Sequence, residues 1–268
     1  MSSSTILKGM QVMEFLAHSK EPRGISEISI AIDMNKSAVQ RILNTFLEAG
    51  YVERAEGTRK YQLTLSIWEL GSYVVSKHVA RRQVHPVLRF ASQSTGCTAF
   101  LAYMSFPFMV YLDKVEGAHG RVNSSEPGRR IPIATTASGL AALAFVRQKQ
   151  LARLANPATD WTGHVAFDSI QPETLHSKLT EVRNNGYATS LSAMTRGVNA
   201  VAAPIWWKDD TPYGSLVLTA DEKNMPADEL ASFGNKVRDM ADEATVALGG
   251  IDARRRSELL IAGLNINI

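Results

Sequence analysis

The stretch MNKSAVQRILNTFLEAGYV, residues 34–52, decides the fold of the first part of the chain. Its apolar residues recur at intervals of three and four, which predicts an amphipathic helix with one buried stripe. That stripe consists of Val39, Ile42, Leu43, Phe46 and Leu47. Asn35 is a favourable N-cap for this helix, and Gly50 is a favourable residue at its C-terminal end. The opposite face is polar and is therefore available to a partner.

The flanking residues predict the setting of this helix. Residues 5–18 have helical spacing, and residues 25–32 form a second, short helix with Ser26 as its expected N-cap. Asp33 follows at the turn, where we expect a left-handed backbone. Beyond Gly50, residues 51–63 predict two short strands around the turn sequence AEGT. Three helices followed by a hairpin are the element order of a winged helix-turn-helix.

The polar face of the third helix suits the major groove of double-stranded DNA. An α-helix fits this groove, where Asn and Gln pair with adenine and Arg pairs with guanine. Basic residues of the hairpin would hold the flanking phosphates. The predicted DNA-binding residues are Ser26, Asn35, Lys36, Ser37, Gln40, Arg41, Asn44, Arg54, Arg59 and Lys60. The alternative is a polar face covered only by solvent, but the complete element order favours DNA.

The segment ISEISIAIDMNKSAVQRILNTFLEAGYVERAEGTRKYQLT, residues 25–64, resembles the N-terminal domain of the IclR family of bacterial transcription regulators. Three later segments resemble the effector-binding domain of the same family, which is related to the GAF fold. They are PGRRIPIATTASGLAALAF (127–145), NNGYATS (184–190) and RGVNAVAAPI (196–205). The chain departs from the family at its turn, where Asp33 and Met34 replace the usual Gly-Leu pair.

The remaining pattern predicts an α+β protein with two domains. Strands are expected around SFP near residue 106, and in the segments GYATSL, VNAVAAPIWW and YGSLVLTAD. Helices are expected at about 135–150, 172–185 and 226–249. The predicted parts are a winged helix-turn-helix domain (1–63), a linker helix (64–80), a GAF-like effector-binding domain (81–250) and a C-terminal tail (251–268) with the basic triplet Arg254–Arg256.

The resemblance implies an effector pocket between the sheet and the loop–helix that begins near RIPIATTASG. The implied lining residues are Ile131, Ala137, Ser138, Ser190, Ala200, Val201, Val217 and Thr219. Where the family often carries acidic residues, this chain has TSLSAMTRG, whose only charged residue is Arg196. A guanidinium without a nearby carboxylate favours a carboxylate ligand, so we expect Arg196 to bind a small organic acid, aromatic acids included. A solvated loop position is the alternative for Arg196.

Composition and motifs exclude several other classes. The 268 residues are 45% hydrophobic and carry a net charge of +3, which is ordinary for a soluble protein. No apolar run is long enough for a membrane span, and no signal peptide is expected. The single cysteine, Cys97, lies in an apolar strand pattern and is expected in the core, which fits the reducing cytoplasm. No metal-binding, phosphate-loop or catalytic motif occurs, so neither a cofactor nor an enzyme is expected.

These observations predict a ligand-responsive transcription regulator, either a repressor or an activator of a catabolic operon. Because one recognition helix contacts few bases, the protein would bind a palindromic operator as a homodimer or homotetramer. The alternative is a small-molecule sensor or enzyme whose N-terminal helices serve only for dimerisation.

Overall fold

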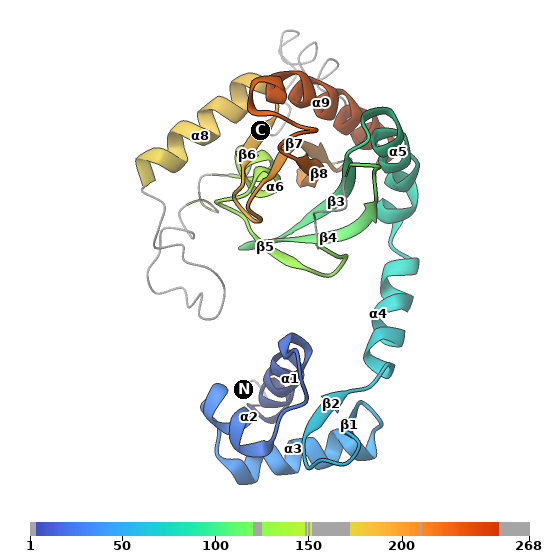
Figure 1. Cartoon of the computed structure of the whole chain (residues 1–268), viewed down its shortest axis with the longest axis vertical. Helices are drawn as coiled ribbons and strands as arrows, with labels where there is room; N and C mark the ends of the chain where they lie inside the picture. The colour runs from blue at the N-terminus through green and yellow to red at the C-terminus, as the bar shows by residue number, and fades with distance from the viewer. Residues whose placement is uncertain are drawn as a thin grey trace. The chain divides into compact units, whose positions relative to one another are not determined.

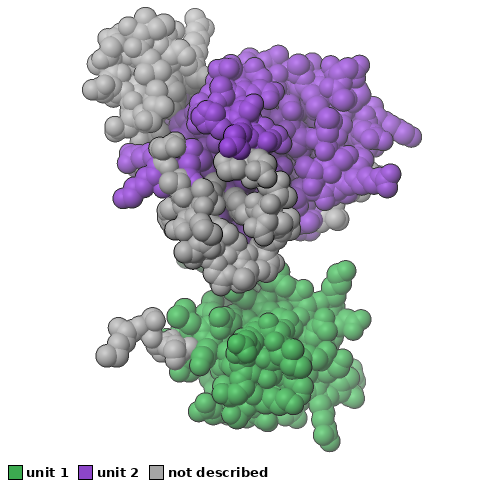
Figure 2. All heavy atoms as spheres, turned by 90° about the vertical axis from the view of Figure 1, so that its left-hand side faces the viewer, with its two compact units in different colours: residues 1–77 green, residues 78–268 purple. Residues whose placement is uncertain are grey.

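The computed structural model describes residues 4–119, 125–147, 149, 151, 172–208 and 211–251. The chain divides into two compact units, Met1–Lys77 and His78–Ile268, which Figure 2 shows in different colours. None of the described helices is long and apolar enough to span a membrane. The predicted tail after residue 251 lies outside the described residues.

The first unit is a small helical domain with a hairpin (Figure 1). Its elements are α1 (Ser4–His18), α2 (Ile25–Ala31), α3 (Lys36–Glu48), β1 (Val52–Arg54), β2 (Tyr61–Leu63) and α4 (Ser66–Ser76). The two strands pair antiparallel, with Val52 opposite Leu63. Val39 and Leu43 of α3 are fully buried in a core shared with α1, α2 and the hairpin. The helical spacing in residues 34–52 therefore predicted the buried face of α3 correctly.

The turn and the caps of this unit follow from particular residues. Asp33 has a φ of 48°, the left-handed conformation expected from the sequence. Asn35 is the N-cap of α3, and its Oδ1 accepts a hydrogen bond from the Ala38 amide at 2.8 Å. The expectation that Ser26 caps α2 is wrong, because Gly24 is the N-cap. The Glu27 carboxylate instead accepts from the Gly24 amide at 2.7 Å, and Ser26 lies in the first helical turn.

The predicted linker helix 64–80 is shorter in the structure. Helix α4 ends at Ser76, and the next helix, α5, begins at Val79. The break arises because His78 has an extended backbone, with φ −70° and ψ 116°, and forms the N-cap of α5. The division between the two compact units lies at this break.

The second unit is a six-stranded antiparallel sheet covered by helices, which confirms the α+β class. Its elements are α5 (Val79–Thr95), β3 (Thr98–Ser105), β4 (Phe108–Val115), β5 (Arg130–Pro132), α6 (Ala137–Leu143), α8 (Pro172–Asn185), β6 (Ala188–Leu191), β7 (Val198–Trp206), β8 (Pro212–Asp221), η2 (Ala227–Glu229) and α9 (Leu230–Ala247). The strand order is β5-β4-β3-β8-β7-β6. The short strand β5 was not predicted from the sequence.

The two faces of this sheet have different partners. Helices α5 and α9 pack together on one face, and α6, with α8 against it, packs on the other (Figure 1). Successive residues of a strand point to opposite faces, so Ala200 and Ala202 of β7 face α6, whereas Val201 points the other way. Cys97 is fully buried as expected, and burial raises the pKa of its thiol.

Candidate DNA interface and effector cavity

The outward face of α3 carries the polar row predicted from the sequence. Val39 and Leu43 on the other face are fully buried, which fixes the rotation of the helix about its axis. The exposed side chains are Lys36, Ser37, Gln40, Arg41 and Asn44. Five donor or acceptor side chains are thereby presented on one side of a helix that follows a helix-turn, as base and phosphate recognition in the major groove requires.

Two residues of the predicted set also hold the start of α3. The Oδ1 atom of Asn35 accepts hydrogen bonds from the Ala38 amide at 2.8 Å and from the Ser37 hydroxyl at 2.9 Å. These bonds satisfy a helix-terminal N–H group that would otherwise lack a partner. Asn35 and Ser37 therefore have a structural role in addition to the predicted DNA contact.

Ser26, which was also predicted to contact DNA, is exposed in the first turn of α2.

The hairpin presents three cationic side chains. Arg54, Arg59 and Lys60 are exposed, and the Arg54 guanidinium lies 5.7 Å from the centre of the Tyr61 ring. No carboxylate in the described part of the chain forms an ion pair with any of the three. Cations that are not held in an intramolecular ion pair are suited to DNA phosphates.

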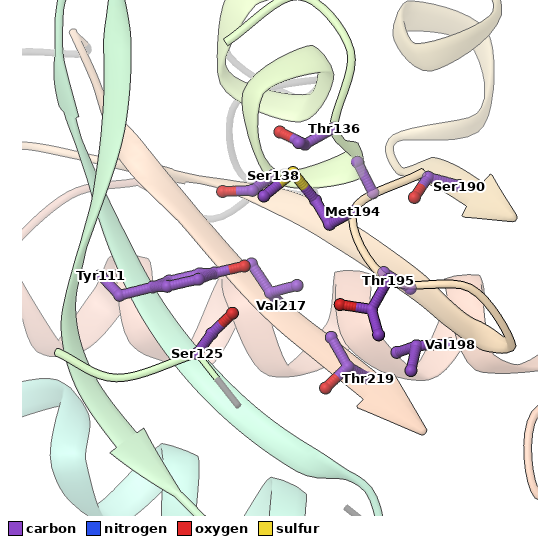
Figure 3. Close-up of a pocket in the computed structure, with 12 residues that line it drawn as sticks. Tyr111, Ser125, Thr136, Ser138, Ser190, Met194, Thr195, Val198, Val217 and Thr219 are labelled. Atoms are coloured by element: carbon purple, nitrogen blue, oxygen red, sulfur yellow. The ribbon is translucent and has the colours of Figure 1, made fainter. Parts of the chain in front are cut away.

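The second unit contains a partly open cavity of about 30 Å³ between α6 and the sheet, bordered by Met194 and Thr195 of the loop 192–197 (Figure 3). Its lining residues are Tyr111, Ser125, Thr136, Ala137, Ser138, Ser190, Met194, Thr195, Val198, Ala200, Val217 and Thr219. Seven of these twelve side chains carry a hydroxyl group and the other five are apolar. Since none of them is charged, the cavity wall offers directional hydrogen bonds in an uncharged surface.

Several of these hydroxyl groups are fixed by the fold. Thr136 caps α6: its hydroxyl accepts from the Gly139 amide at 3.1 Å and donates to the Pro132 carbonyl at 2.8 Å. The Ser138 hydroxyl bonds to that of Ser215 at 2.8 Å, and both residues are buried. These contacts connect the cavity wall to α6 and β8 and hold it in place.

Tyr111 forms the wall at one end of the cavity. Its ring stacks on Phe100 with 4.3 Å between centres. Burial raises the pKa of the Tyr111 hydroxyl to about 12, and the positive charge of Arg129 opposes that shift. At neutral pH the group is therefore protonated and is able to donate a hydrogen bond.

The structure brings six of the nine predicted effector residues to the cavity. They are Ala137, Ser138, Ser190, Ala200, Val217 and Thr219. The other three predicted residues, Ile131, Arg196 and Val201, do not line this cavity. Val201 follows Ala200 on β7 and so points to the opposite face of the sheet. Ile131, on β5, is buried in the hydrophobic core.

Arg196 is the third predicted residue that the cavity lining does not include. Its side chain is exposed and does not line the cavity, although Thr195 beside it does. The expectation of a guanidinium inside the pocket came from counting charges in a loop, whereas the direction of each side chain is set by the loop backbone. The alternative of a solvated loop position fits the structure better.

Six lining residues were not predicted from the sequence, namely Tyr111, Ser125, Thr136, Met194, Thr195 and Val198. Val198 could have been found, because it lies two residues before Ala200 and so shares its face of β7. Tyr111 comes from β4, two strands away from β8 in the sheet. Its place depends on strand order, of which a single sequence carries no direct signal.

The two halves of the chain, an exposed helix-turn-helix row and a hydroxyl-lined cavity, are the parts of a ligand-responsive transcription regulator. Comparison with family models supports this class of protein. Residues 5–56 match the IclR helix-turn-helix domain, and residues 72–246 match the bacterial transcriptional regulator IclR C-terminal domain. The chain belongs to the IclR family of transcription regulators and is not an enzyme.

Individual relatives extend along nearly the whole chain. It is 26% identical over 245 residues to the HTH-type transcriptional regulator XynR of Escherichia coli K12, covering 91% of this chain and 97% of that protein. The fold matches an IclR family transcriptional regulator from Brucella abortus with a TM-score of 0.74 at 23% identity, covering 91% and 92% of the two chains. It also matches an IclR homologue from Microbacterium hydrocarbonoxydans complexed with 4-hydroxybenzoate, with a TM-score of 0.70 at 19% identity, covering 91% and 98%.

Proposed function

We propose that this regulator binds a palindromic operator with α3 in the major groove, and that a small organic acid in the cavity changes its affinity for that operator. The observation that carries the DNA assignment is the exposed row of Lys36, Gln40, Arg41 and Asn44, since these side chains have no role in the core of their own unit. The hairpin cations extend this surface to the flanking phosphates. The site of action is the cytoplasm, where the operator lies.

The apolar surface of the first unit supports a homo-oligomer. Helix α4 has no buried residue, and Trp68 and Tyr73 are 69% and 67% exposed. Helix α1 also exposes Ile6, at 68%. Large apolar side chains that remain in water favour association, and a palindromic operator requires two recognition helices. A second copy of this chain is therefore the proposed cover for these faces, in a homodimer or a homotetramer.

The acid assignment rests on the chemistry of the cavity. Hydroxyl groups from several elements converge on it, and Met194, Val198, Ala200 and Val217 leave an apolar surface for a carbon skeleton. The Microbacterium homologue with the same fold was crystallised with 4-hydroxybenzoate, a small aromatic acid. Acids of this size are consistent with the catabolic operon that we propose as the target. The position of the operator relative to the promoter decides whether the protein represses or activates.

A gel-shift titration tests this function. The full-length protein is mixed with DNA from upstream of its own gene, with and without a panel of small carboxylic acids. We expect a specific complex with a footprint of two related half-sites, and a shift in affinity with at least one acid. By linkage, operator DNA must then change the affinity for that acid by the same factor. Failure to bind this DNA more tightly than random DNA at equal salt would contradict the proposal.

A further inference from the structure

One end of the cavity is backed by a positive charge that is not part of its lining. Ser125 lines the cavity and is only 4% exposed. Its hydroxyl oxygen accepts a hydrogen bond from Nη1 of Arg129 at 3.2 Å. Figure 3 shows the hydroxyl groups of Ser125 and Tyr111 at the same end of the cavity. The Arg129 side chain is exposed to solvent, and its Nη1 lies one hydroxyl group away from the Tyr111–Ser125 end of the cavity.

Among the described residues, Arg129 forms no ion pair, in contrast to Lys114. Lys114 is held by Glu116 at 2.9 Å and by Glu126 at 2.8 Å. Among the residues that the structure describes, no carboxylate lies within ion-pair distance of Arg129. A negative group bound at the Tyr111–Ser125 end would therefore be the nearest counter-ion. An opposite charge nearby favours the charged form of a carboxyl group.

We propose that Arg129, acting behind Ser125, makes the cavity select ligands with an anionic group, and that this group binds at the Tyr111–Ser125 end. The inference rests on the effector function proposed above and replaces Arg196, which lies outside the lining, as the source of positive charge. A carboxylate there accepts a hydrogen bond from the Tyr111 hydroxyl. The carbon skeleton of the ligand extends toward Val198, Ala200 and Val217.

The size of the cavity is consistent with this orientation. A volume of about 30 Å³ holds only one or two water molecules, so an organic acid must displace part of the wall. The Met194 and Thr195 wall belongs to the loop 192–197, and Met194 is 39% exposed. The opposite wall belongs to β4 and to the residues that precede β5, where Arg129 and Ser125 are bonded. Ligand entry therefore moves the loop and leaves the anion-selecting end in place.

Titration calorimetry on the full-length protein tests this inference. The probes are benzoate and 4-hydroxybenzoate, with acetate and pyruvate as aliphatic acids, each compared with its uncharged amide. We expect wild-type protein to bind at least one acid at least tenfold more tightly than its amide. Arg129→Gln should reduce that ratio about tenfold or more, and Arg129→Lys should restore most of it. Affinity for the amide should change less than twofold, because a charge behind the wall contributes little to a neutral ligand.

Two other arginines provide matched controls. Arg130 adjoins Arg129 but lies over the Phe108 ring at 5.8 Å, and Arg196 is exposed on the loop. Arg130→Gln and Arg196→Gln should each leave the acid-to-amide ratio within about twofold of wild type. The inference is overturned if Arg129→Gln keeps the ratio, if it weakens acid and amide equally, or if no acid binds wild-type protein better than its amide. Operator binding in the gel shift is a separate measurement, so loss of acid selection alone leaves the DNA assignment standing.

Discussion

The DNA face of α3 and the cavity of the second unit are both polar, but they are built in different ways. The DNA face comes from one helix, and its side chains point into solvent. The cavity draws its lining from β4, α6, β6, β7, β8 and the adjoining loops, and most of its hydroxyl groups are at least partly buried. The residues on the DNA face are determined by the rotation of a single helix about its own axis. The residues that line the cavity are determined by the register of several strands.

This difference has a consequence for how each site tolerates change. Substitutions on the α3 row remove contacts to a partner and leave the core intact. Substitutions at the cavity alter packing as well, because the lining residues Tyr111, Ala137, Ala200 and Val217 also belong to the hydrophobic core or pack against it. The following predictions use paired variants to separate partner contacts from packing.

The largest expected effect is on the stability of the first unit. Leu43 is fully buried on the inner side of α3, and Ile30 of α2 is 81% exposed. Leu43→Ala should destabilise the unit by about 2–5 kcal/mol, through lost burial and a residual cavity. Ile30→Ala should change stability by no more than about 0.5 kcal/mol. A thermal melt followed by circular dichroism measures both, and equal losses would show that the assigned face of α3 is wrong.

The next largest effect concerns operator binding. Gln40→Ala and Arg41→Ala should each weaken specific binding by about 1–3 kcal/mol, the value of a good base contact. Their melting temperatures should match wild type, because both side chains are exposed. Arg82→Ala, an exposed arginine of α5, is the control for the loss of one positive charge. Gel shifts at matched salt compare the three variants. Unchanged operator affinity in both α3 variants would show that this face of α3 contacts only solvent.

A third prediction tests the assignment of faces on β7. Ala200 lines the cavity and Val201 faces the other side of the sheet. Ala200→Leu should fill the cavity and abolish the response to acids, at a packing cost of about 1–3 kcal/mol. Val201→Leu should have a comparable effect on stability but keep the response. Acid titrations of operator complexes distinguish the two variants, and a response retained in Ala200→Leu would mean that effectors bind elsewhere.

The sequence predicted the helix-turn-helix in most of its detail because the signals there are local. The 3.6-residue period gave the buried face of α3, and the single residues Asp33 and Asn35 gave the turn and the cap. Side chains that converge from separate strands leave no such local signal. Tyr111 enters the cavity only through the order β4-β3-β8 of the sheet. Ser125 and Arg129 were missed because their importance depends on a 3.2 Å contact and on Arg129 forming no ion pair among the described residues.

The smallest expected effect concerns the start of α2, where the sequence indicated Ser26 and the structure shows Glu27. The hydrogen bond from the Gly24 amide, together with that from Arg23, lowers the pKa of the Glu27 carboxyl below its ordinary value of 4.5. A lowered folded-state pKa means that the carboxylate stabilises the unit above pH 4.5 and that this contribution disappears as the pH falls through the folded pKa. Glu27→Gln should therefore lower the melting temperature at pH 7 but have little effect at pH 3. Ser26→Ala should have a negligible effect at both values, since Ser26 does not cap the helix. Melting curves of the two variants across this range decide between the two residues. A larger loss of melting temperature for Ser26→Ala than for Glu27→Gln at pH 7 would assign the cap to Ser26. A loss for Glu27→Gln that is the same at pH 3 as at pH 7 would show that the charge of Glu27 does not stabilise the unit.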